Sequence, residues 1–239
     1  MTKPYFRAAI TMLASLLLTP AWADSRLIDF AGYQWTVKSS GSGTVGPGPN
    51  HFSDSSDNVW VDSKGKLHLK ITQDSDGNWQ CAEVYLNPSL GYGSYQFKLA
   101  TDLGDIDPNI VLGLFTYDNN PAYHYREIDI EFAKWSDPAN PDNVQYTVQP
   151  PRSGTYYAWP LTTGYAKTTH SFKWAAKKVS FKSVAGDVTL AQWSDTRAGS
   201  IPPPGAEVVH LNLWLNQGQA PMNGTPFEVV ISGFTFTPP

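Results

Sequence analysis

Apolar and polar residues alternate along several short stretches of this chain. The clearest examples are residues 81–86, 109–117, 126–132 and 211–216, where an aliphatic or aromatic residue occupies every second position. A period of two is typical of β-strands, because successive side chains point to opposite faces of a sheet. Gly and Pro are frequent between these runs, and almost no stretch shows a helical period. The pattern predicts an all-β sandwich or barrel.

The second face of these strands has an unusual composition. A solvated face ordinarily carries Lys, Thr, Ser and Glu, whereas this one carries Trp, Tyr, Phe, Asn and carboxylates and hardly any Lys. Aromatic rings pack against the C–H patches of sugar rings, and amides bond to the hydroxyl groups. We therefore predict that one sheet is concave and binds a chain of sugars. The alternative is a solvated face with scattered aromatic residues.

The first 23 residues have the features of a secretory signal peptide. Lys3 and Arg7 form a basic start, residues 8–18 are apolar, and "AWA" ending at Ala23 is a cleavage site of the small-x-small kind. A membrane anchor is the alternative, but the apolar run is shorter than the roughly 20 residues that span a bilayer. We expect a secreted protein, extracellular or periplasmic, with residues 24–239 forming one domain and a monomer.

Composition narrows the possible partners and chemistry. Without Lys3 and Arg7 the chain keeps 15 of its 17 basic residues against 21 acidic ones, so its formal charge changes from −4 to about −6. No basic run is left, which argues against nucleic acid as a partner, and an acidic protein is poorly suited to polyanionic glycans. Cys81 is the only cysteine. We expect it to pack as a small buried residue and not to act as a nucleophile.

The stretch "YREIDIEF", residues 125–132, places Glu127, Asp129 and Glu131 on one face of a predicted strand. Acidic residues are depleted in strands, and like charges close together destabilise a sheet, so this arrangement needs a functional reason. Glycoside hydrolysis requires one carboxyl group kept protonated as an acid and one ionised as nucleophile or base. A third carboxylate separates their pKa values, because repulsion raises the affinity of one group for a proton. The three acids are therefore the candidate catalytic residues of a glycosidase.

Spacing along the strand does not decide the stereochemistry of such a reaction. Four residues of strand separate the Cα atoms of Glu127 and Glu131 by about 13 Å. Retaining enzymes hold their two carboxyl groups about 5–5.5 Å apart, and inverting enzymes hold them about 6.5–9.5 Å apart. Long side chains that lean together over a concave strand close much of the gap, so both outcomes stay open at this point.

"EIDIEF" preceded by an aromatic residue resembles the active-site strand of glycoside hydrolase family 16, which includes lichenases, laminarinases and xyloglucan transferases. The E-x-D-x-E pattern is similar to the lichenase and xyloglucan branch, because laminarinase-like members have one extra residue before the last glutamate. The resemblance covers roughly residues 30 to 237. It implies a jelly-roll β-sandwich of two curved antiparallel sheets with a concave glycan-binding cleft. It also implies a retaining reaction with Glu127 as nucleophile, Glu131 as general acid/base and Asp129 hydrogen-bonded to the nucleophile.

Further stretches resemble the same family, namely "PNHFS", "CAEVYL", "GYGSYQF", "VLGLFTY" and "LNLW". The resemblance implies a set of substrate-binding residues in the cleft. They are Asn50, Glu83, Phe115, Tyr117, Tyr125, Gln145, Gln149, Asn212 and Trp214. The members of this set that lie on the alternating strands occupy the polar faces assigned above from periodicity alone.

Departures from the family pattern bear on the choice of glycan. Family members of this branch usually carry an aspartate just before the nucleophile, where this chain has Arg126. Two positions that usually carry asparagine or an aromatic residue resemble Thr147 and Gln149. The default expectation is an endo-acting hydrolase of a neutral β-glucan with mixed β-1,3 and β-1,4 linkages. A transglycosylase with the same residues and a lectin-like binding module are the alternatives.

The sequence predicts no metal site. Its five histidines show no H-x-H or HExxH spacing, and "DSDGNW", residues 74–79, lacks the terminal glutamate of a calcium loop and is typical of a hairpin turn. Family members often carry a structural calcium ion near the chain ends, but this sequence has no strong ligand set for it. We expect no cofactor, with a structural calcium ion as the alternative. We also expect a polysaccharide or oligosaccharide partner and no membrane contact after cleavage of the signal.

Overall fold

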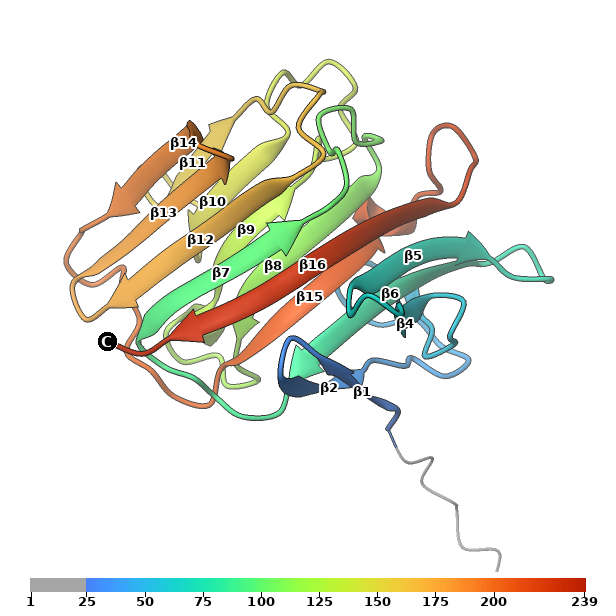
Figure 1. The fold of residues 1–239 in the computed structure, drawn as a ribbon, viewed down its shortest axis with the longest axis horizontal. Helices are drawn as coiled ribbons and strands as arrows, with labels where there is room; N and C mark the ends of the chain where they lie inside the picture. Colours follow the sequence, from blue (N-terminus) through green and yellow to red (C-terminus); the bar gives the residue numbers. More distant parts are fainter. Residues whose placement is uncertain (1–24) are drawn as a thin grey trace, which may run out of the picture.

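Figure 1 shows the computed structural model of the chain, which describes residues 25–239. The predicted signal peptide, residues 1–23, lies outside the described residues. Regular structure in the described part is almost entirely β-strand, and its two helices are the short 3-10 turns η1 (His124–Arg126) and η2 (Asn216–Gly218). No helix among these residues is long and apolar enough to cross a membrane. The prediction of an all-β fold is confirmed.

Six strands form the inner sheet. In spatial order they are β11 (Tyr156–Trp159), β10 (Val144–Val148), β9 (Ile128–Phe132), β8 (Ile110–Tyr117), β15 (Val208–Leu215) and β6 (Trp79–Leu86). All these neighbours pair in antiparallel fashion. Three short strands extend the β6 side, namely β2 (Tyr33–Val37), its partner β1 (Leu27–Phe30), and β3 (His51–Phe52), which pairs with β6 in parallel.

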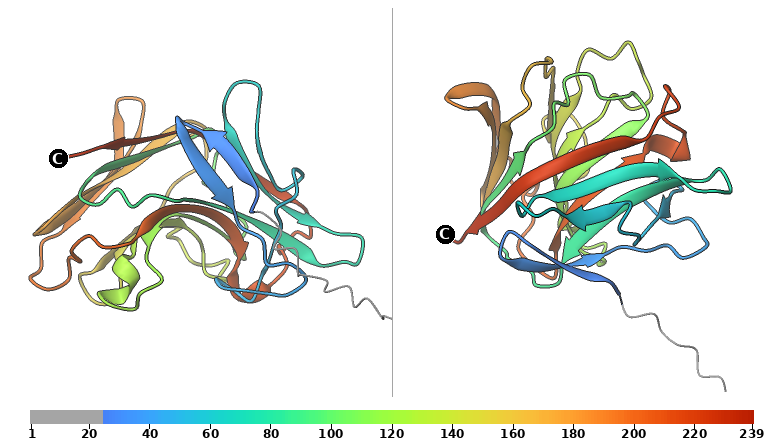
Figure 2. Two further views of the ribbon diagram at one scale, coloured as in Figure 1. Left: turned by 90° about the horizontal axis from the view of Figure 1, so that it is seen from below. Right: turned by 45° about the vertical axis from the view of Figure 1, so that its right-hand side comes forward.

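A second set of strands forms the outer sheet, which lies in front in Figure 1. In spatial order these are β5 (Leu67–Gln73), β16 (Phe227–Thr237), β7 (Gly93–Leu99), β12 (Thr168–Ala175), β13 (Lys178–Ala185) and β14 (Val188–Asp195), and β4 (Val59–Val61) pairs with β5. The sheets are joined where β5 pairs with β6, whereas β11 and β14 end the strand order at the opposite side. Figure 2 shows that both layers curve, so that the inner sheet is concave.

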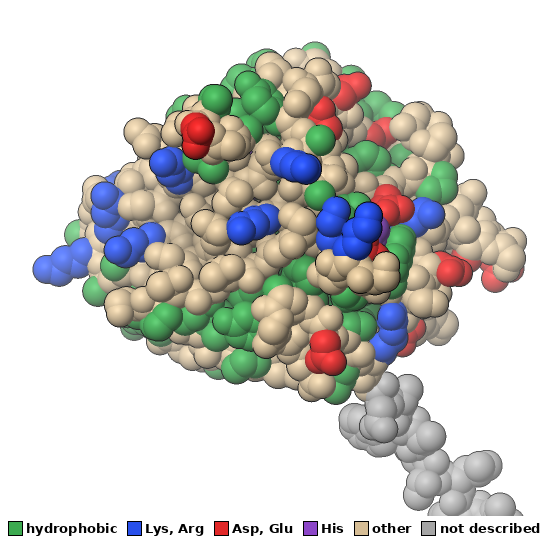
Figure 3. All heavy atoms as spheres, viewed as in Figure 1, with side chains coloured by type: hydrophobic (Ala, Val, Ile, Leu, Met, Phe, Trp, Pro, Cys, Tyr) green, Lys and Arg blue, Asp and Glu red, His purple; other side chains and the backbone are tan. Residues whose placement is uncertain are grey.

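The exposed face of the outer sheet has an ordinary solvated composition. Figure 3 shows this face, with lysine side chains spread over it, and Lys98, Lys173 and Lys182 are exposed. Their strand neighbours across the sheet are serine, threonine and glutamine. The unusual face that the sequence predicts, rich in acids, amides and aromatics, belongs instead to the inner sheet.

The aliphatic faces of the two sheets meet in the core between them. Ile128, Ile130 and Phe132 are completely buried there, as predicted, and Cys81 is also buried. Burial of a side chain of this size contributes about 1.5–3 kcal/mol. A shift of β9 by one residue would expose all three apolar side chains, so their burial fixes the register. It thereby places the alternating acids on the concave face.

Candidate active site

Strand β9 carries two of the three acids, and the third directly precedes it. Asp129 and Glu131 alternate with the buried residues of β9, and Glu127 follows η1. Residues directly opposite each other on neighbouring strands share a face, so the acids lie in rows across the concave sheet. The first row is Gln145, Glu131, Gly113, Asn212 and Glu83, and the second is Thr147, Asp129, Phe115, His210 and Tyr85.

A cavity of about 970 Å³ lies on this face. All three acids line it, together with side chains from β6, β8 and β15 and from nearby loops. These side chains are Lys38, Glu83, Tyr85, Phe115, Tyr117, Asp118, His210, Asn212 and Trp214. Within residues 25–239, no group of three or more His, Cys, Asp and Glu side chains is placed to hold a metal ion. The cavity therefore combines carboxyl groups with amides and aromatic rings, as the alternation of the sequence predicts.

Gly113 is the smallest residue of the first row, and it pairs with Glu131 on one side and Asn212 on the other. A Cβ atom at this position would lie 2.4 Å from Oδ1 of Asn212. Real Cβ atoms do not approach oxygen this closely, so a larger residue would displace the amide. Glycine thus leaves room for the Asn212 side chain in the row that contains Glu131.

Burial raises the pKa of all three acidic side chains. The pKa of Glu131 rises to about 8 because of burial and, secondly, the charge of Glu127. Burial raises the pKa of Glu127 to about 7, and a hydrogen bond from Asp129 opposes part of this rise. The pKa of Asp129 lies well above its ordinary value because of burial and then the charges of both glutamates. Raised pKa values allow one glutamate to keep a proton as general acid near neutral pH, while the hydrogen bond from Asp129 favours the ionised form of Glu127, as a nucleophile requires.

Asp129 is the most deeply buried of the three acids, with 1% of its surface exposed. Its Oδ2 accepts a hydrogen bond from Nε2 of Gln149 at 2.9 Å, and its Oδ1 is buried with no donor in the described part of the chain. A proton retained on Asp129 can be donated to Glu127, which replaces repulsion by a hydrogen bond. This bond stabilises the ionised form of Glu127.

The replacement Glu131→Gln is expected to stabilise the fold above neutral pH. The folded-state pKa of about 8 lies above the ordinary value of 4.5, so the folded state holds the proton more tightly than the unfolded state. Stability is therefore lost as the pH rises from 4.5 through 8. Glutamine removes this loss, and we expect the free energy of unfolding to rise by about 2 kcal/mol at pH 8, after allowance for partial solvent screening. Thermal unfolding should show little change at about pH 4, and an equal shift at both pH values would contradict the explanation.

Most of the predicted substrate-binding residues are brought together. Those that line the cavity are Glu83, Phe115, Tyr117, Asn212 and Trp214. Tyr125 lies beside them, because its ring stacks on that of Tyr117 with the ring centroids 5.2 Å apart. Asn50, Gln145 and Gln149 are not lining residues of the cavity.

The side-chain amides of Asn50, Gln145 and Gln149 form hydrogen bonds with other groups of the protein. Asn50 is 3% exposed, and its Nδ2 donates to two backbone oxygens. Gln149 donates to Asp129, and Gln145 donates to Oγ1 of Thr147 at 2.8 Å. These bonds give Gln149 a second role, since it holds the acid that neighbours the candidate nucleophile. Contact of the three amides with substrate stays a prediction.

Sequence reasoning missed Lys38 and His210. Nζ of Lys38 lies 2.7 Å from Oε2 of Glu83, and Nδ1 of His210 lies 2.8 Å from Oε1. Burial raises the pKa of Glu83, but these contacts bring it below its ordinary value. The ring of His210 lies between those of Tyr85 and Phe115, with centroids 5.4 and 5.0 Å away. Glu83 is thus an ionised group whose two carboxylate oxygens contact Lys38 and His210, at the β6 end of the first row.

Four consecutive residues before Glu127 adopt the left-handed backbone conformation. The φ angles of Tyr123, His124, Tyr125 and Arg126 are 54°, 53°, 61° and 50°. This conformation costs about 1–2 kcal/mol for each residue that is not glycine. Such strain persists only where surrounding contacts hold the backbone, and it concentrates at functional sites. The contacts that hold this turn therefore also fix the point at which Glu127 enters β9.

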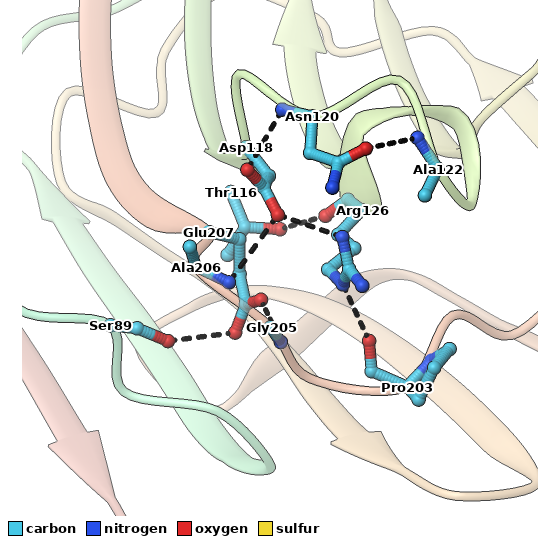
Figure 4. A network of polar contacts seen from close by, with 10 residues as sticks. All are labelled: Ser89, Thr116, Asp118, Asn120, Ala122, Arg126, Pro203, Gly205, Ala206 and Glu207. Carbon is cyan, nitrogen blue, oxygen red and sulfur yellow. Dashed lines mark hydrogen bonds and ion pairs between the residues drawn. The ribbon is translucent and has the colours of Figure 1, made fainter.

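Figure 4 shows these contacts, which centre on Arg126. Its Nη1 pairs with Oδ2 of Asp118 at 2.7 Å, and its Nε donates to the backbone oxygen of Pro203 at 3.1 Å. The hydroxyl of Thr116 donates to the carbonyl oxygen of Arg126 at 2.9 Å, and the backbone N–H of Ala206 donates to Asp118. The turn is thus tied to β8 and to the loop that precedes β15.

The described part of the chain has the fold of solved glycoside hydrolase family 16 glucanases. A prokaryotic β-1,3-1,4-glucanase (lichenase) from a mouse hindgut metagenome matches with a TM-score of 0.63 and 22% identity, over 91% of this chain and 96% of that chain. The GH16 protein of the Bacteroides ovatus mixed linkage glucan PUL, in complex with its G4G4G3G product, matches with a TM-score of 0.63 and 12% identity, over 85% and 94%.

A third similar structure differs in its described activity. It is an immunostimulatory antigen and pseudo β-1,3-glucanase of Mycobacterium tuberculosis, which matches with a TM-score of 0.62 and 19% identity, over 84% of this chain and 89% of that chain. No family model matches the sequence, and no curated protein matches it. At these identities the likeness establishes the fold, and the activity is argued from the site.

Proposed function

We propose that this protein is a secreted family 16 glycoside hydrolase that cleaves within neutral β-glucan chains with retention of configuration. The observation that carries the proposal is the cavity on the concave sheet, into which Glu127, Asp129 and Glu131 all project. The raised pKa values of both glutamates suit a reaction that needs one protonated carboxyl group, and the hydrogen bond from Asp129 favours Glu127 as the ionised one. The resemblance of the E-x-D-x-E strand to lichenases supports the same roles.

The reaction proceeds by two displacements. The carboxylate of Glu127 attacks the anomeric carbon while Glu131 donates its proton to the glycosidic oxygen, so that the C–O bond breaks and the leaving sugar departs as an alcohol. Glu131, now ionised, takes a proton from a water molecule that attacks the glycosyl ester of Glu127. The ester bond breaks, the sugar is released, and Glu131 is again protonated. The hydrogen bond from Asp129 favours ionised Glu127 as nucleophile and as leaving group.

A neutral glycan fits the remaining walls of the cavity. The charge of Glu83 is balanced by Lys38, and the neighbouring walls are aromatic rings and the Asn212 amide. Aromatic faces favour the C–H patches of sugar rings, and the three catalytic acids disfavour an anionic substrate. Two similar structures are described with mixed-linkage glucans, and mixed β-1,3 and β-1,4 glucan is our default substrate.

Reducing-end release from a panel of neutral glycans tests the proposal. Mixed-linkage β-glucan, laminarin, xyloglucan, agarose and chitin are incubated with the purified protein and, in parallel, with its Glu127→Gln variant. Release from one glycan by the wild-type protein, absent in the variant, supports the hydrolase and names its substrate. Release that persists in the variant contradicts the role of Glu127.

A non-catalytic glycan-binding protein is the second candidate, because one similar structure is described as a pseudo β-1,3-glucanase. It predicts retention on a glycan column without release of reducing ends from any member of the panel. A transglycosylase predicts little release but a redistribution of chain lengths when an acceptor oligosaccharide is added. Chromatography of the products distinguishes both from the hydrolase.

A further inference from the structure

Lysine side chains gather on one part of the outer sheet, away from the cavity that the acids line. This lysine patch, on β7, β12, β13 and the turn between β12 and β13, consists of Lys98, Lys173, Lys177, Lys178 and Lys182, all of them exposed. It holds a third of the 15 basic residues outside the predicted signal peptide, so positive charge is concentrated here in a chain that is acidic as a whole. Figure 3 shows lysine side chains together over this part of the face.

No carboxylate balances the charge of the lysine patch. Strands β7, β12, β13 and β14 contain one acidic residue, Asp195, whose buried carboxylate pairs with Arg197 at 2.7 Å. Asp187 is exposed, but it lies in the turn after β13, at the opposite end of that strand from Lys178. Among residues 25–239, no lysine of the patch forms an ion pair. A solvated face ordinarily mixes both signs of charge, and this part of an otherwise ordinary polar face does not.

The strand register brings three of these lysines close together. Lys173 lies opposite Ser180, and Lys178 and Lys182 lie two residues to either side of Ser180 on β13. Both are therefore diagonal neighbours of Lys173, at about 7–8 Å on the same face of the sheet. Like charges at this distance repel each other, and the fold gives no reason to place them there. An anionic partner that binds between them would offset the repulsion.

A groove of about 540 Å³ lies where these three lysines meet, and all three line it. The other polar side chains of the groove carry hydroxyl or amide groups and come from β7, β12, β13 and β14. They are Ser94, Ser171, Ser180, Gln192 and Ser194. Phe172 and Phe181 alternate with these residues and are buried in the core. The groove thus presents positive charge beside groups that form hydrogen bonds.

This lining favours a carboxylated polysaccharide over other polyanions. Hydroxyl and amide groups bond to sugar hydroxyls, and lysines pair with carboxylates. Arginine is the preferred side chain for phosphate groups, and binding of single-stranded nucleic acid relies on exposed aromatic rings. No arginine lines the groove, and its outward-facing positions are serine, glutamine and lysine. These positions also lack the apolar side chains with which a protein enters a lipid surface.

We propose that this groove binds an acidic polysaccharide through its carboxylate groups, with Lys173, Lys178 and Lys182 as the charged contacts. The inference goes beyond the proposed hydrolase function and does not depend on it, because the groove lies on the outer sheet and the cavity on the inner one. A protein held in this way on an acidic polymer keeps its cavity open to a neutral glycan.

Binding of the purified protein to immobilised polygalacturonate at low ionic strength tests the proposal. The double variant Lys173→Gln/Lys182→Gln is expected to raise Kd about tenfold, because two charged contacts are lost. Lys64→Gln/Lys66→Gln is the matched control, since it removes the same net charge beside β4 and β5, outside the groove, and should keep the wild-type Kd. Fully methyl-esterified polygalacturonate, which has the same backbone without the charge, should bind at least tenfold more weakly. Added salt should weaken binding of the acidic polymer.

Three results overturn the proposal. They are no binding of the wild-type protein to polygalacturonate, equal Kd values for the two double variants, and equal binding of the acidic and the esterified polymer. Tighter binding to single-stranded RNA or to vesicles of anionic lipid overturns the choice of a polysaccharide. Reducing-end release from the neutral glycans is measured separately, and Lys173→Gln/Lys182→Gln should match the wild-type protein there. A protein that binds polygalacturonate but releases no reducing ends contradicts the proposed hydrolase function and leaves the groove supported.

Discussion

Glu127→Ala is expected to lower the turnover of β-glucan by about 10⁴-fold or more, and sodium azide should restore part of it. Alanine removes the nucleophile and leaves space beside the anomeric carbon. Azide in that space attacks the carbon directly while Glu131 protonates the leaving oxygen. The product is a glycosyl azide of inverted configuration, because only one displacement takes place. Proton NMR of the anomeric region measures both the rate and the configuration.

Glu131→Ala is the matched control for this experiment. It leaves the nucleophile intact, so a nitrophenyl glycoside, whose leaving group needs no protonation, still forms the glycosyl ester. Azide then intercepts that ester and gives a product of retained configuration. An exchange of the two configurations between the variants would reverse the roles of Glu127 and Glu131. Absence of azide products from both would contradict a covalent intermediate.

Arg126→Ala is expected to lower the free energy of unfolding by about 3 kcal/mol. Asp118, whose side chain is 6% exposed, would be left as a buried carboxylate without its cation. The bond to the backbone of Pro203 would be lost too, so the left-handed turn would lose the side chain that ties it to the loop before β15. Urea unfolding measures the effect. We also expect lower turnover, because the turn positions Glu127.

Asp118→Ala and the double variant complete a cycle that isolates the ion pair. Replacement of both partners removes the uncompensated charge, so the double variant should be more stable than the sum of the two single effects predicts, by at least about 1 kcal/mol. Arg126→Lys keeps the positive charge but lacks the guanidinium group that bonds to Asp118 and Pro203 together. Its free energy of unfolding should therefore lie between those of Arg126→Ala and the wild-type protein. Strictly additive effects would show that this pair is not what holds the turn.

The strands that carry the site were predictable because alternate residues of each strand are apolar and face the core, while the residues between them carry the polar groups of the site. Ile128, Ile130 and Phe132 must face the core, and that requirement alone sends Asp129 and Glu131 to the opposite face. His210 was predictable in the same way, since it precedes Asn212 by two residues on β15. The alternation alone places His210 on the concave face, although this histidine belongs to no sequence motif.

Other parts of the site depend on contacts that no local pattern records. Lys38 follows β2 and reaches Glu83 through the pairing of β2 with β6, which is a long-range contact. The left-handed turn contains no glycine, so its backbone is set by Arg126 and its partners and not by residue preference. For Asn50, periodicity gives only an approximate location, and the resemblance alone could not show that its amide is buried against the backbone.

The joint between β5 and β6 leaves the opposite side of the sandwich, at β11 and β14, as a border of two terminal strands. There the stack of Tyr157 on Trp193 is a contact between side chains and not a backbone ladder. Terminal strands open at low free energy, and their amides exchange hydrogen with water early. The sandwich is therefore expected to open first at β11 and β14, on the side away from the β5–β6 joint, and the central strands β8 and β15 should keep their amide hydrogens longest.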